Sequence, residues 1–458
     1  MTKKICVIGG GISGLCTAFR LKKKGIEVLL IERGEICGGN IQTEKIDDFL
    51  IEWGPNSTLA SAPLFELIAE LGLLEEVAPA NATAKKRYIL KDGKLRALPL
   101  KVIEIIGSDI FSTGAKFRLL REPFVRGKSP ENETVAEFFE RRFGQEVVDF
   151  AVDPFVSGIF AGNPERLSIK SAFPNLFQME KDYGSILKAS VFGKKEKPSE
   201  LVPKGISRTI SFKNGMQTLT DKLAENLSGE IRTKTEVLKI GKVESGKWKV
   251  ESNAEDLNRE LFDAVVVAAP SFVAAKFVEN LDGELSRQLS EIYHPPLAVI
   301  VSAFYKKDIN FDLDGFGFLI PKVEGRKILG SLWSSVIFEN RAPNDVQLLT
   351  TFIGGARNAD LFDKSDEELF GIAFEELDSI LGLKGKPIFQ QIRRWQRAIP
   401  QYNIGYEKIT DSIENFKKTH AGFFFCSNFY RGISVSDCIK SSSLTTDEVL
   451  NFLDEEKN

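Results

Sequence analysis

The sequence predicts an α/β protein with a discontinuous Rossmann-like domain, an α+β domain and a helical insertion. Four observations support this expectation. The first 32 residues read as strand, glycine turn, helix and strand, while residues 263–270 form the continuous apolar run of a strand buried in a parallel sheet. The stretch 99–204 is helical in pattern. At 458 residues the chain exceeds the size at which one core keeps growing, so several lobes are expected.

A glycine-rich turn separates the first predicted strand from the first predicted helix, residues 15–24. Gly9 permits the tight turn, Gly11 lets backbone approach a pyrophosphate closely, and Gly14 lets the helix pack against the sheet. The N–H groups at the start of that helix would then point at the phosphates. The spacing favours a dinucleotide-binding unit over a glycine turn that holds nothing.

The second predicted strand, residues 27–31, ends at an acidic residue. Glu32 follows Gly14 at roughly the 20-residue spacing of a carboxylate that binds an adenosine ribose hydroxyl. Its negative charge favours an unphosphorylated ribose, because the 2′-phosphate of NADP would be repelled. Two later turns, residues 37–40 and 54–57, contain the Gly, Pro and Asn of non-repetitive backbone that passes close to a ligand.

Further elements follow from periodicity and turn residues. Residues 63–74 alternate as a helix that stops near Gly72, and residues 87–90 and 95–98 form a hairpin around Asp92-Gly93. Later segments are predicted as helices at 215–227, 271–281, 284–292, 365–381 and 434–453, and as strands at 231–233, 236–240, 248–251, 298–304, 316–320, 327–333, 347–353 and 422–426. The last helix is expected to aim its N-terminus at the same ligand as Gly11.

These elements divide the chain into three predicted domains. The Rossmann-like domain comprises residues 1–84, 205–270 and 404–458, and the α+β substrate domain comprises 85–98 and 271–403. The helical insertion, 99–204, mixes apolar residues with basic ones, among them Lys101, Lys116, Arg118 and Arg121. Such a mixture suits a lobe that dips into a membrane interface, although the residues alone favour a helical insertion packed on the core.

Composition excludes several other classes of protein. The net charge of −3 gives no sign of a nucleic-acid partner, and the run at 295–305 is shorter than the about 20 residues that span a bilayer. The five cysteines show no disulfide or metal spacing, and no signal peptide is recognised, so a cytoplasmic protein is expected. Neither His294 nor His420 has a second ligand at metal spacing, so no metal site is predicted, and His294 is a weak catalytic candidate.

A specific signal lies at residues 153–168, which read DPFVSGIFAGNPERLS and are followed by SAFP at 171–174. With the opening glycines, this block resembles the flavin-dependent protoporphyrinogen oxidases, the oxygen-dependent branch of the amine oxidase superfamily. The resemblance covers nearly the whole chain, and other flavin amine oxidases lack the block in this form. Departures from the family pattern are small polar replacements, at Asn163, Ser436 and residues 441–443.

The resemblance implies a cofactor, FAD, and a site for it. Val237 would meet the adenine through its backbone. Asn428, with Ile433, Ser434 and Val435, would border the isoalloxazine. The implied FAD contacts are Gly9, Gly10, Gly11, Ile12, Ser13, Gly14, Glu32, Arg33, Asn40, Gly54, Pro55, Asn56, Ser57, Val237, Asn428, Ile433, Ser434 and Val435.

The resemblance also implies a substrate site. Arg87 matches an arginine that pairs with a porphyrinogen propionate, which suits a planar guanidinium that binds carboxylate in a bidentate manner. Phe160 is placed beside the substrate, and the backbone of Gly158 and Gly162 is expected near the reacting carbon. Few acid or base side chains are available, as expected where the cofactor performs the chemistry.

The implied function is the six-electron oxidation of protoporphyrinogen IX to protoporphyrin IX in heme biosynthesis, with O2 consumed and H2O2 released. Oxidation of coproporphyrinogen III remains an alternative, which an extra basic cluster would favour. A flavin amine oxidase is disfavoured for want of a paired aromatic cage, although Trp395 and Tyr402 keep it open. A non-catalytic flavin-binding membrane scaffold is the last alternative. Peripheral contact with the inner face of a membrane, and a homodimer, are compatible with the resemblance.

Overall fold

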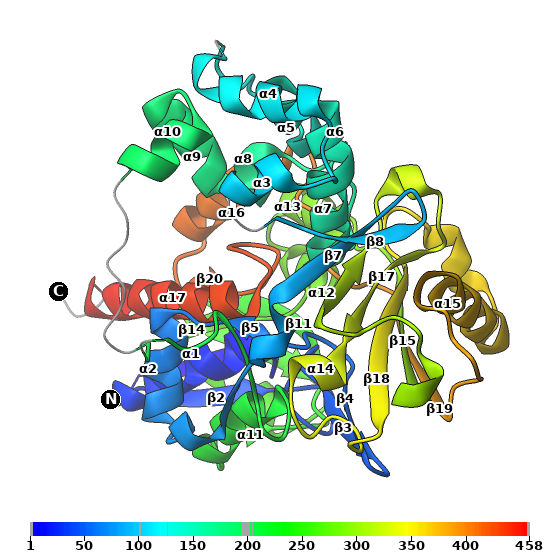
Figure 1. Ribbon diagram of the computed structural model, residues 1–458. Coiled ribbons are helices and arrows are strands. Elements are labelled where there is room, and N and C mark those ends of the chain that lie inside the picture. Colours follow the sequence, from blue (N-terminus) through cyan, green and yellow to red (C-terminus); the bar gives the residue numbers. More distant parts are fainter. Residues whose placement is uncertain (1–2, 100–101, 126, 194–201, 204, 456–458) are drawn as a thin grey trace.

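A five-stranded sheet in the order β10-β2-β1-β14-β20 joins the head, middle and tail of the chain (Figure 1). All four neighbouring pairs are parallel, and β14 lies between β1 and β20. The Rossmann-type α/β fold and the buried strand at 263–270 are therefore confirmed. The five strands are β1 (Lys4–Ile8), β2 (Glu27–Ile31), β10 (Ile231–Arg232), β14 (Ala264–Val267) and β20 (Phe423–Phe425).

The structure is a computed structural model that describes residues 3–99, 102–125, 127–193, 202–203 and 205–455. Lys101, one of the basic residues expected in the helical insertion, lies outside the described residues.

The first helix, α1 (Ile12–Lys23), begins three residues earlier than the sequence predicts. Gly11 is its N-cap, with extended backbone at φ −74° and ψ 177°. The first helical hydrogen bond runs from the Leu15 N–H to the Gly11 carbonyl at 2.9 Å. Ser13 and Gly14 therefore belong to the first helical turn, because helix geometry starts as soon as the glycine turn has reversed the chain.

Helices and a small sheet cover both faces of the five-stranded sheet. Along β1 the side chains alternate, since Ile5 and Val7 join one core while Cys6 and Ile8 join the other. The first core lies under α1, α2 (Ala62–Glu70), α11 (Gln217–Asn226) and α17 (Val435–Glu455). The second lies under α12 (Ser271–Val278), α13 (Gly283–Ser290), α16 (Tyr406–Thr419) and the sheet of β11 (Val237–Lys242), β12 (Trp248–Ser252) and β13 (Leu261–Phe262).

The second large sheet has seven strands in the order β19-β15-β18-β17-β16-β7-β8. The predicted hairpin lies at its edge, where Asp92 and Gly93 take the positive φ of a tight hairpin turn. Helix α15 (Asp366–Leu381) packs on one face. The strands are β7 (Lys86–Lys91), β8 (Lys94–Ala97), β15 (Leu297–Tyr305), β16 (Gly315–Leu319), β17 (Ile328–Trp333), β18 (Val346–Gly354) and β19 (Phe389–Trp395).

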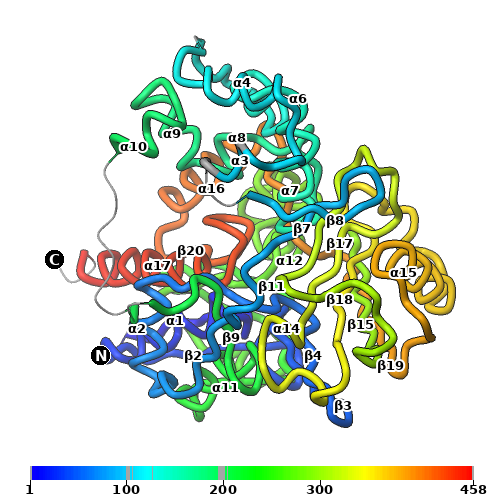
Figure 2. The backbone as a smooth tube through the Cα atoms, viewed as in Figure 1, coloured from blue at the N-terminus to red at the C-terminus, as the bar shows by residue number. Residues whose placement is uncertain are grey.

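A helical lobe stands beside the two sheets, at the top of Figures 1 and 2. Helices form most of the described part of residues 99–204, as predicted, around a core of their own that includes Phe138 and Val156. Its helices are α3 (Val102–Gly107), α4 (Thr113–Arg121), α5 (Val135–Phe143), α6 (Gln145–Val147), α7 (Asp153–Phe160), α8 (Ile169–Ala172), α9 (Pro174–Tyr183) and α10 (Ile186–Phe192).

Several elements were not predicted, most of them because they are brief or rich in polar residues. They include β19, α16 and the hairpin of β3 (Thr43–Ile46) and β4 (Phe49–Glu52). Helix α16 does carry a helical period, with Tyr406, Ile409, Ile413 and Phe416 on one face, which sequence reasoning missed. A three-stranded sheet of β5 (Thr58–Leu59), β9 (Thr209–Phe212) and β6 (Val77–Pro79), and the short helix α14 (Ser334–Ile337), complete the described elements other than 3₁₀ and π turns.

A buried carboxyl group lies where β4 meets the start of α11. Glu52, 3% exposed, accepts hydrogen bonds from the Thr43 hydroxyl at 2.7 Å and the Met216 N–H at 2.8 Å. Its nearest cation is Arg341, whose Nη2 lies 3.8 Å from the carboxyl oxygen Oε1. Burial outweighs these contacts and raises the pKa of Glu52 to about 7.

Stability should therefore fall as the pH rises from about 4.5 to about 7, because the folded protein binds the Glu52 proton more tightly than the unfolded chain does. Glu52→Gln keeps a neutral side chain of the same shape and should remove this part of the pH dependence. Urea unfolding of both proteins at pH 5, 6, 7 and 8 measures the difference. The advantage of the variant should grow with pH, and parallel profiles would show that Glu52 titrates normally.

Candidate active site

The glycine turn after β1 has the shape of a backbone cradle. A Cβ atom on Gly9 would lie 2.7 Å from the Ala268 carbonyl oxygen, and one on Gly14 would lie 1.9 Å from the Gly9 oxygen. A Cβ on Gly11 would meet nothing closer than Gly39 Cα at 4.0 Å. Gly9 and Gly14 are thus required by packing, whereas Gly11 leaves its backbone open to a ligand.

Glu32 is held against this cradle. One carboxylate oxygen accepts the Gly10 N–H at 2.7 Å, and the other accepts the Gly34 N–H at 2.7 Å. Each oxygen can accept a further hydrogen bond, which suits a ribose hydroxyl. The neighbouring Arg33 is exposed.

The turns at 37–40 and 54–57 are brought to the same place. The Gly38 N–H donates to the Gly10 carbonyl at 2.8 Å, and Gly54 lies so close to Asn40 that a Cβ there would be 1.8 Å from the Asn40 oxygen. Asn56 donates to the Ser334 hydroxyl at 3.2 Å, but its buried Oδ1 has no partner among the described residues. An unpartnered buried acceptor in this position fits a ligand that donates a hydrogen bond.

Two helix N-termini converge beside the cradle. Ser13 of α1 lies beside Cys438 of α17, so the first turns of the two helices are neighbours. Arg20 of α1 also donates to the Ile439 carbonyl at 3.2 Å. The first turn of α1 has neither a side-chain cap nor an acidic residue. Its N–H groups and the positive end of its dipole are therefore available to an anion such as a pyrophosphate.

The remaining predicted cofactor residues lie on other elements. Asn428 follows β20, and Ile433 packs between the second core of the five-stranded sheet and the core of the helical lobe. Ser434 caps α17, since its hydroxyl accepts the Asp437 N–H at 3.0 Å, and Val435 starts the helix. Val237 begins β11. Together with Ile12, Pro55 and Ser57, the described residues fit a dinucleotide such as FAD.

The substrate block begins with helix α7, whose first residue ties it to the seven-stranded sheet. Asp153 accepts hydrogen bonds from Arg357 Nη2 and from the Lys322 N–H, both at 2.7 Å. Arg357 also donates to the Ile320 carbonyl at 2.7 Å. Burial raises the pKa of Asp153, and the Arg357 charge opposes that rise. Sequence reasoning missed Arg357, because 204 residues separate it from Asp153.

Gly158 lets α7 pack closely on the same sheet. A Cβ there would lie 2.7 Å from Leu319 Cδ2, whereas a Cβ on Gly162 would lie 2.4 Å from Gln401 Oε1. Phe160 is 4% exposed and packs edge-on against Phe173. These contacts explain why small residues stand at 158 and 162, and the catalytic and substrate roles expected of Gly158, Gly162 and Phe160 stay predictions.

Arg87 lies in β7, on the sheet face that receives α7. Its side chain points to the same face as that of Ile89, two residues along the strand. Ile89 is in register with Leu319, the residue that a Cβ on Gly158 would contact. The guanidinium lies 4.7 Å from the centre of the Phe316 ring and has no acidic partner among the described residues. Half-burial lowers the pKa of Arg87. A cation that is partly desolvated and unpaired suits a carboxylate ligand.

Trp395 and Tyr402, the two aromatic residues that left an amine oxidase as an alternative, form hydrogen bonds with backbone groups. The Trp395 indole donates to the Trp53 carbonyl at 2.9 Å. The Tyr402 phenol hydrogen-bonds backbone on both sides, at Asn428 and Gly432. In the part of the chain that the structure describes, no three His, Cys, Asp or Glu side chains form a metal-binding group.

Comparison with known proteins identifies a family and several similar proteins for this chain. Residues 12–450 match the model of a family described as flavin containing amine oxidoreductase. The chain is 35% identical to protoporphyrinogen oxidase 2, chloroplastic/mitochondrial, of Arabidopsis thaliana, over 99% of this chain and 94% of the relative. It is 28% identical to coproporphyrinogen III oxidase of Bacillus subtilis (strain 168), over 98% of each. A crystal structure from Exiguobacterium sp. 255-15 shares the fold, with a TM-score of 0.81 at 23% identity over 98% of this chain and 99% of that one.

Proposed function

The chain belongs to the flavin containing amine oxidoreductase family, and we propose that it is an FAD-dependent enzyme that oxidises protoporphyrinogen IX to protoporphyrin IX in heme biosynthesis. The similarity to a protoporphyrinogen oxidase over 99% of the chain supports this assignment. The structural observation that carries it is Arg87, a half-buried guanidinium on the sheet face that receives α7, without an acidic partner among the residues that the structure describes. That cation supplies an anchor for one propionate of a large, otherwise apolar substrate.

The protein's own residues bind and orient the substrate. Arg87 pairs with a propionate, and the exposed side chains of Phe155 and Ile159 on α7 offer apolar contact to the macrocycle. Asp153 and Arg357 fix α7 against the sheet that carries Arg87. FAD, when bound, accepts two electrons in each of three oxidations, so that three O2 become three H2O2 for each porphyrin formed.

Coproporphyrinogen III is the second candidate substrate, because the chain also resembles a coproporphyrinogen III oxidase over 98% of its length. Its four propionates would call for more cations than Arg87. The basic neighbours Lys86 and Arg357 are already paired, with Asp314 and Asp153. This pairing favours the substrate with two propionates.

Side-by-side turnover on the two porphyrinogens tests the proposal. We expect faster formation of fluorescent protoporphyrin, with three H2O2 counted per molecule, and flavin absorbance that bleaches under nitrogen and recovers in air. A preference for coproporphyrinogen III would transfer the assignment to that substrate. Flavin that never bleaches with either substrate would leave a flavin-binding protein without turnover.

We propose that the helical lobe contacts the inner, cytoplasmic face of a membrane. Large apolar side chains are exposed on α4, on the 3₁₀ turn after it (Glu122–Phe124) and on α10: Phe117 is 64% exposed, Phe124 79% and Phe192 76%. The basic residues Arg118 and Arg121 lie on α4 among them. This combination suits the interface of an anionic bilayer. None of the described helices is long and apolar enough to cross a bilayer.

The double variant Phe124→Asp/Phe192→Asp should release the protein from vesicles of anionic phospholipid, because two charges would replace the apolar contacts with the acyl region. Co-sedimentation measures the bound fraction. Leu238→Asp is the matched control, since Leu238 is 60% exposed but lies on β11, away from the lobe. Equal sedimentation of the double variant and the wild type would remove the membrane assignment.

A further inference from the structure

A short segment, residues 401–404, connects the substrate block to the loop that follows β20. On one side the Ser168 N–H donates to the Tyr402 carbonyl at 2.8 Å, and the Ile404 N–H donates to the Arg166 carbonyl at 2.9 Å. The Gln401 amide donates at 2.7 Å to the carbonyl of Phe160, the last residue of α7. The backbone of this segment is therefore fixed to the block that carries α7.

On its other side the segment reaches the loop through one phenol. Tyr402 accepts the Gly432 N–H at 3.0 Å and donates to the Asn428 carbonyl. The ring is 5% exposed, and burial raises its pKa well above the ordinary value, so the hydroxyl keeps the proton that it donates. A single side chain thus satisfies a donor and an acceptor at the two ends of loop 428–432.

The backbone of loop 428–432 is further restricted at Gly432. Gly432 has a φ of +108°, and a Cβ there would lie 2.6 Å from Asp437 Cβ, so only glycine fits where the loop enters α17. Ile433 and Ser434 follow at once. A shift of the loop backbone would therefore be passed directly to the residues that the proposed FAD site places beside the isoalloxazine.

We propose that Tyr402 is a positioning residue that holds loop 428–432, and with it the flavin ring, in register with the substrate helix α7. The proposal rests on the proposed FAD site. Tyr402 touches neither substrate nor cofactor in this assignment. It acts through the backbone of Asn428 and Gly432, while its own backbone is bound to Ser168.

Tyr402→Phe tests the proposal, because it keeps the ring that packs on Phe160 and Tyr406 and removes both hydrogen bonds to the loop. We expect FAD to dissociate from the holoenzyme about tenfold more readily, since a partly buried N–H and a partly buried carbonyl of the loop lose their partner. The flavin absorption bands should also shift. The rate of flavin reduction should fall while KM for the porphyrinogen changes less than twofold.

The matched control is Tyr430→Phe. Tyr430 lies within the same loop, but its phenol donates to Glu414 in an outer ion cluster rather than to the loop backbone. This variant should retain the wild-type affinity for FAD and the wild-type spectrum. Equal FAD affinity and equal spectra in wild type and Tyr402→Phe would overturn the proposal.

A measurement on the unmodified holoenzyme covers the case in which Tyr402→Phe does not fold. The Gly432 N–H, bonded to a buried phenol, should exchange with deuterated solvent at least a hundredfold more slowly than an unprotected amide. Fast exchange at Gly432 would overturn the proposal without any variant. A wild-type protein that binds no FAD would instead refute the proposed function, so the two failures are distinguishable.

Discussion

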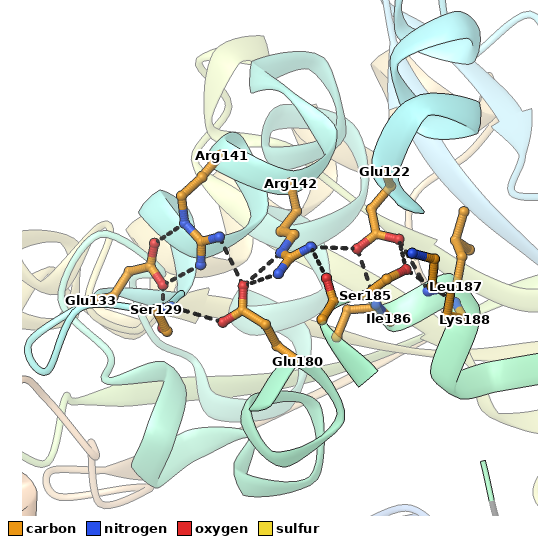
Figure 3. A network of polar contacts seen from close by, with 11 residues as sticks. Glu122, Ser129, Glu133, Arg141, Arg142, Glu180, Ser185, Ile186, Leu187 and Lys188 are labelled. Atoms are coloured by element: carbon orange, nitrogen blue, oxygen red, sulfur yellow. Dashed lines mark hydrogen bonds and ion pairs between the residues drawn. The ribbon is translucent and has the colours of Figure 1, made fainter. Parts of the chain in front are cut away.

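Arg142→Leu should lower the free energy of unfolding by about 3–5 kcal/mol, the largest stability loss expected of any single change considered for this protein. Arg142 is 0% exposed, as is Glu122, and Glu180 is 4% exposed. Its guanidinium lies between the two carboxylates, 3.0 Å from Glu122 and 2.6 Å from Glu180 (Figure 3). Leucine would leave two acidic groups buried without that cation.

The arrangement explains why the loss is large. Glu122 also accepts the N–H groups of Ile186 and Leu187 at 3.0 and 3.2 Å, so it caps the first turn of α10 (Figure 3). Burial tends to raise the pKa of Glu180, but hydrogen bonds from Arg141 and Arg142 lower it overall. Removing Arg142 therefore weakens the packing of α5 against α9 and α10. Helix α10 carries the exposed Phe192.

Urea unfolding measures the effect, and Arg287→Leu is its control. Arg287 pairs with Glu284 and Glu291 on the exposed surface of α13, where an ion pair contributes little. Adding Glu122→Gln and Glu180→Gln to Arg142→Leu should restore part of the stability, since neutral amides no longer need a cation. An Arg142→Leu protein as stable as the Arg287→Leu protein would show that water reaches these carboxylates.

The sequence predicts the parts of this fold that local patterns encode. The glycine spacing predicts the cradle, because Gly9 and Gly14 stand where a Cβ would clash and Gly11 leaves its backbone open to a ligand. The apolar run around β14 predicts a central parallel strand. Arg142 could not be assigned in this way. It stands in an ordinary helical pattern, and its partners are 20 and 38 residues away.

The same distinction applies to the candidate site, where some residues could be identified from the sequence and others could not. Motif residues such as Glu32 and Arg87 could be named from the sequence, because their spacing or context is characteristic. The groups that hold the site together could not, since Arg357 and Tyr402 act across 204 and 26 residues and belong to no local pattern. Tyr402 even suggested an amine cage, whereas its phenol is bonded to loop backbone on both sides.

Arg87→Ala should raise KM for the porphyrinogen about 10- to 100-fold, the range expected when a charge-assisted hydrogen-bonded pair of about 1.5–3 kcal/mol is lost. Flavin content should not change, because Arg87 lies on β7 of the seven-stranded sheet, whereas the glycine cradle follows β1 of the five-stranded sheet. Steady-state kinetics with the flavin-to-protein absorbance ratio of each preparation measures both quantities.

Two further variants identify what Arg87 contributes. Arg87→Lys keeps the charge but loses the planar fork that binds a carboxylate in a bidentate manner, so its KM should lie between those of wild type and Arg87→Ala. Lys86→Ala removes a neighbouring cation that is already paired with Asp314, so its KM should match the wild type. If Lys86→Ala raised KM as much as Arg87→Ala, general attraction by positive charge would explain the effect. If neither did, the propionate anchor would have to be sought on another element.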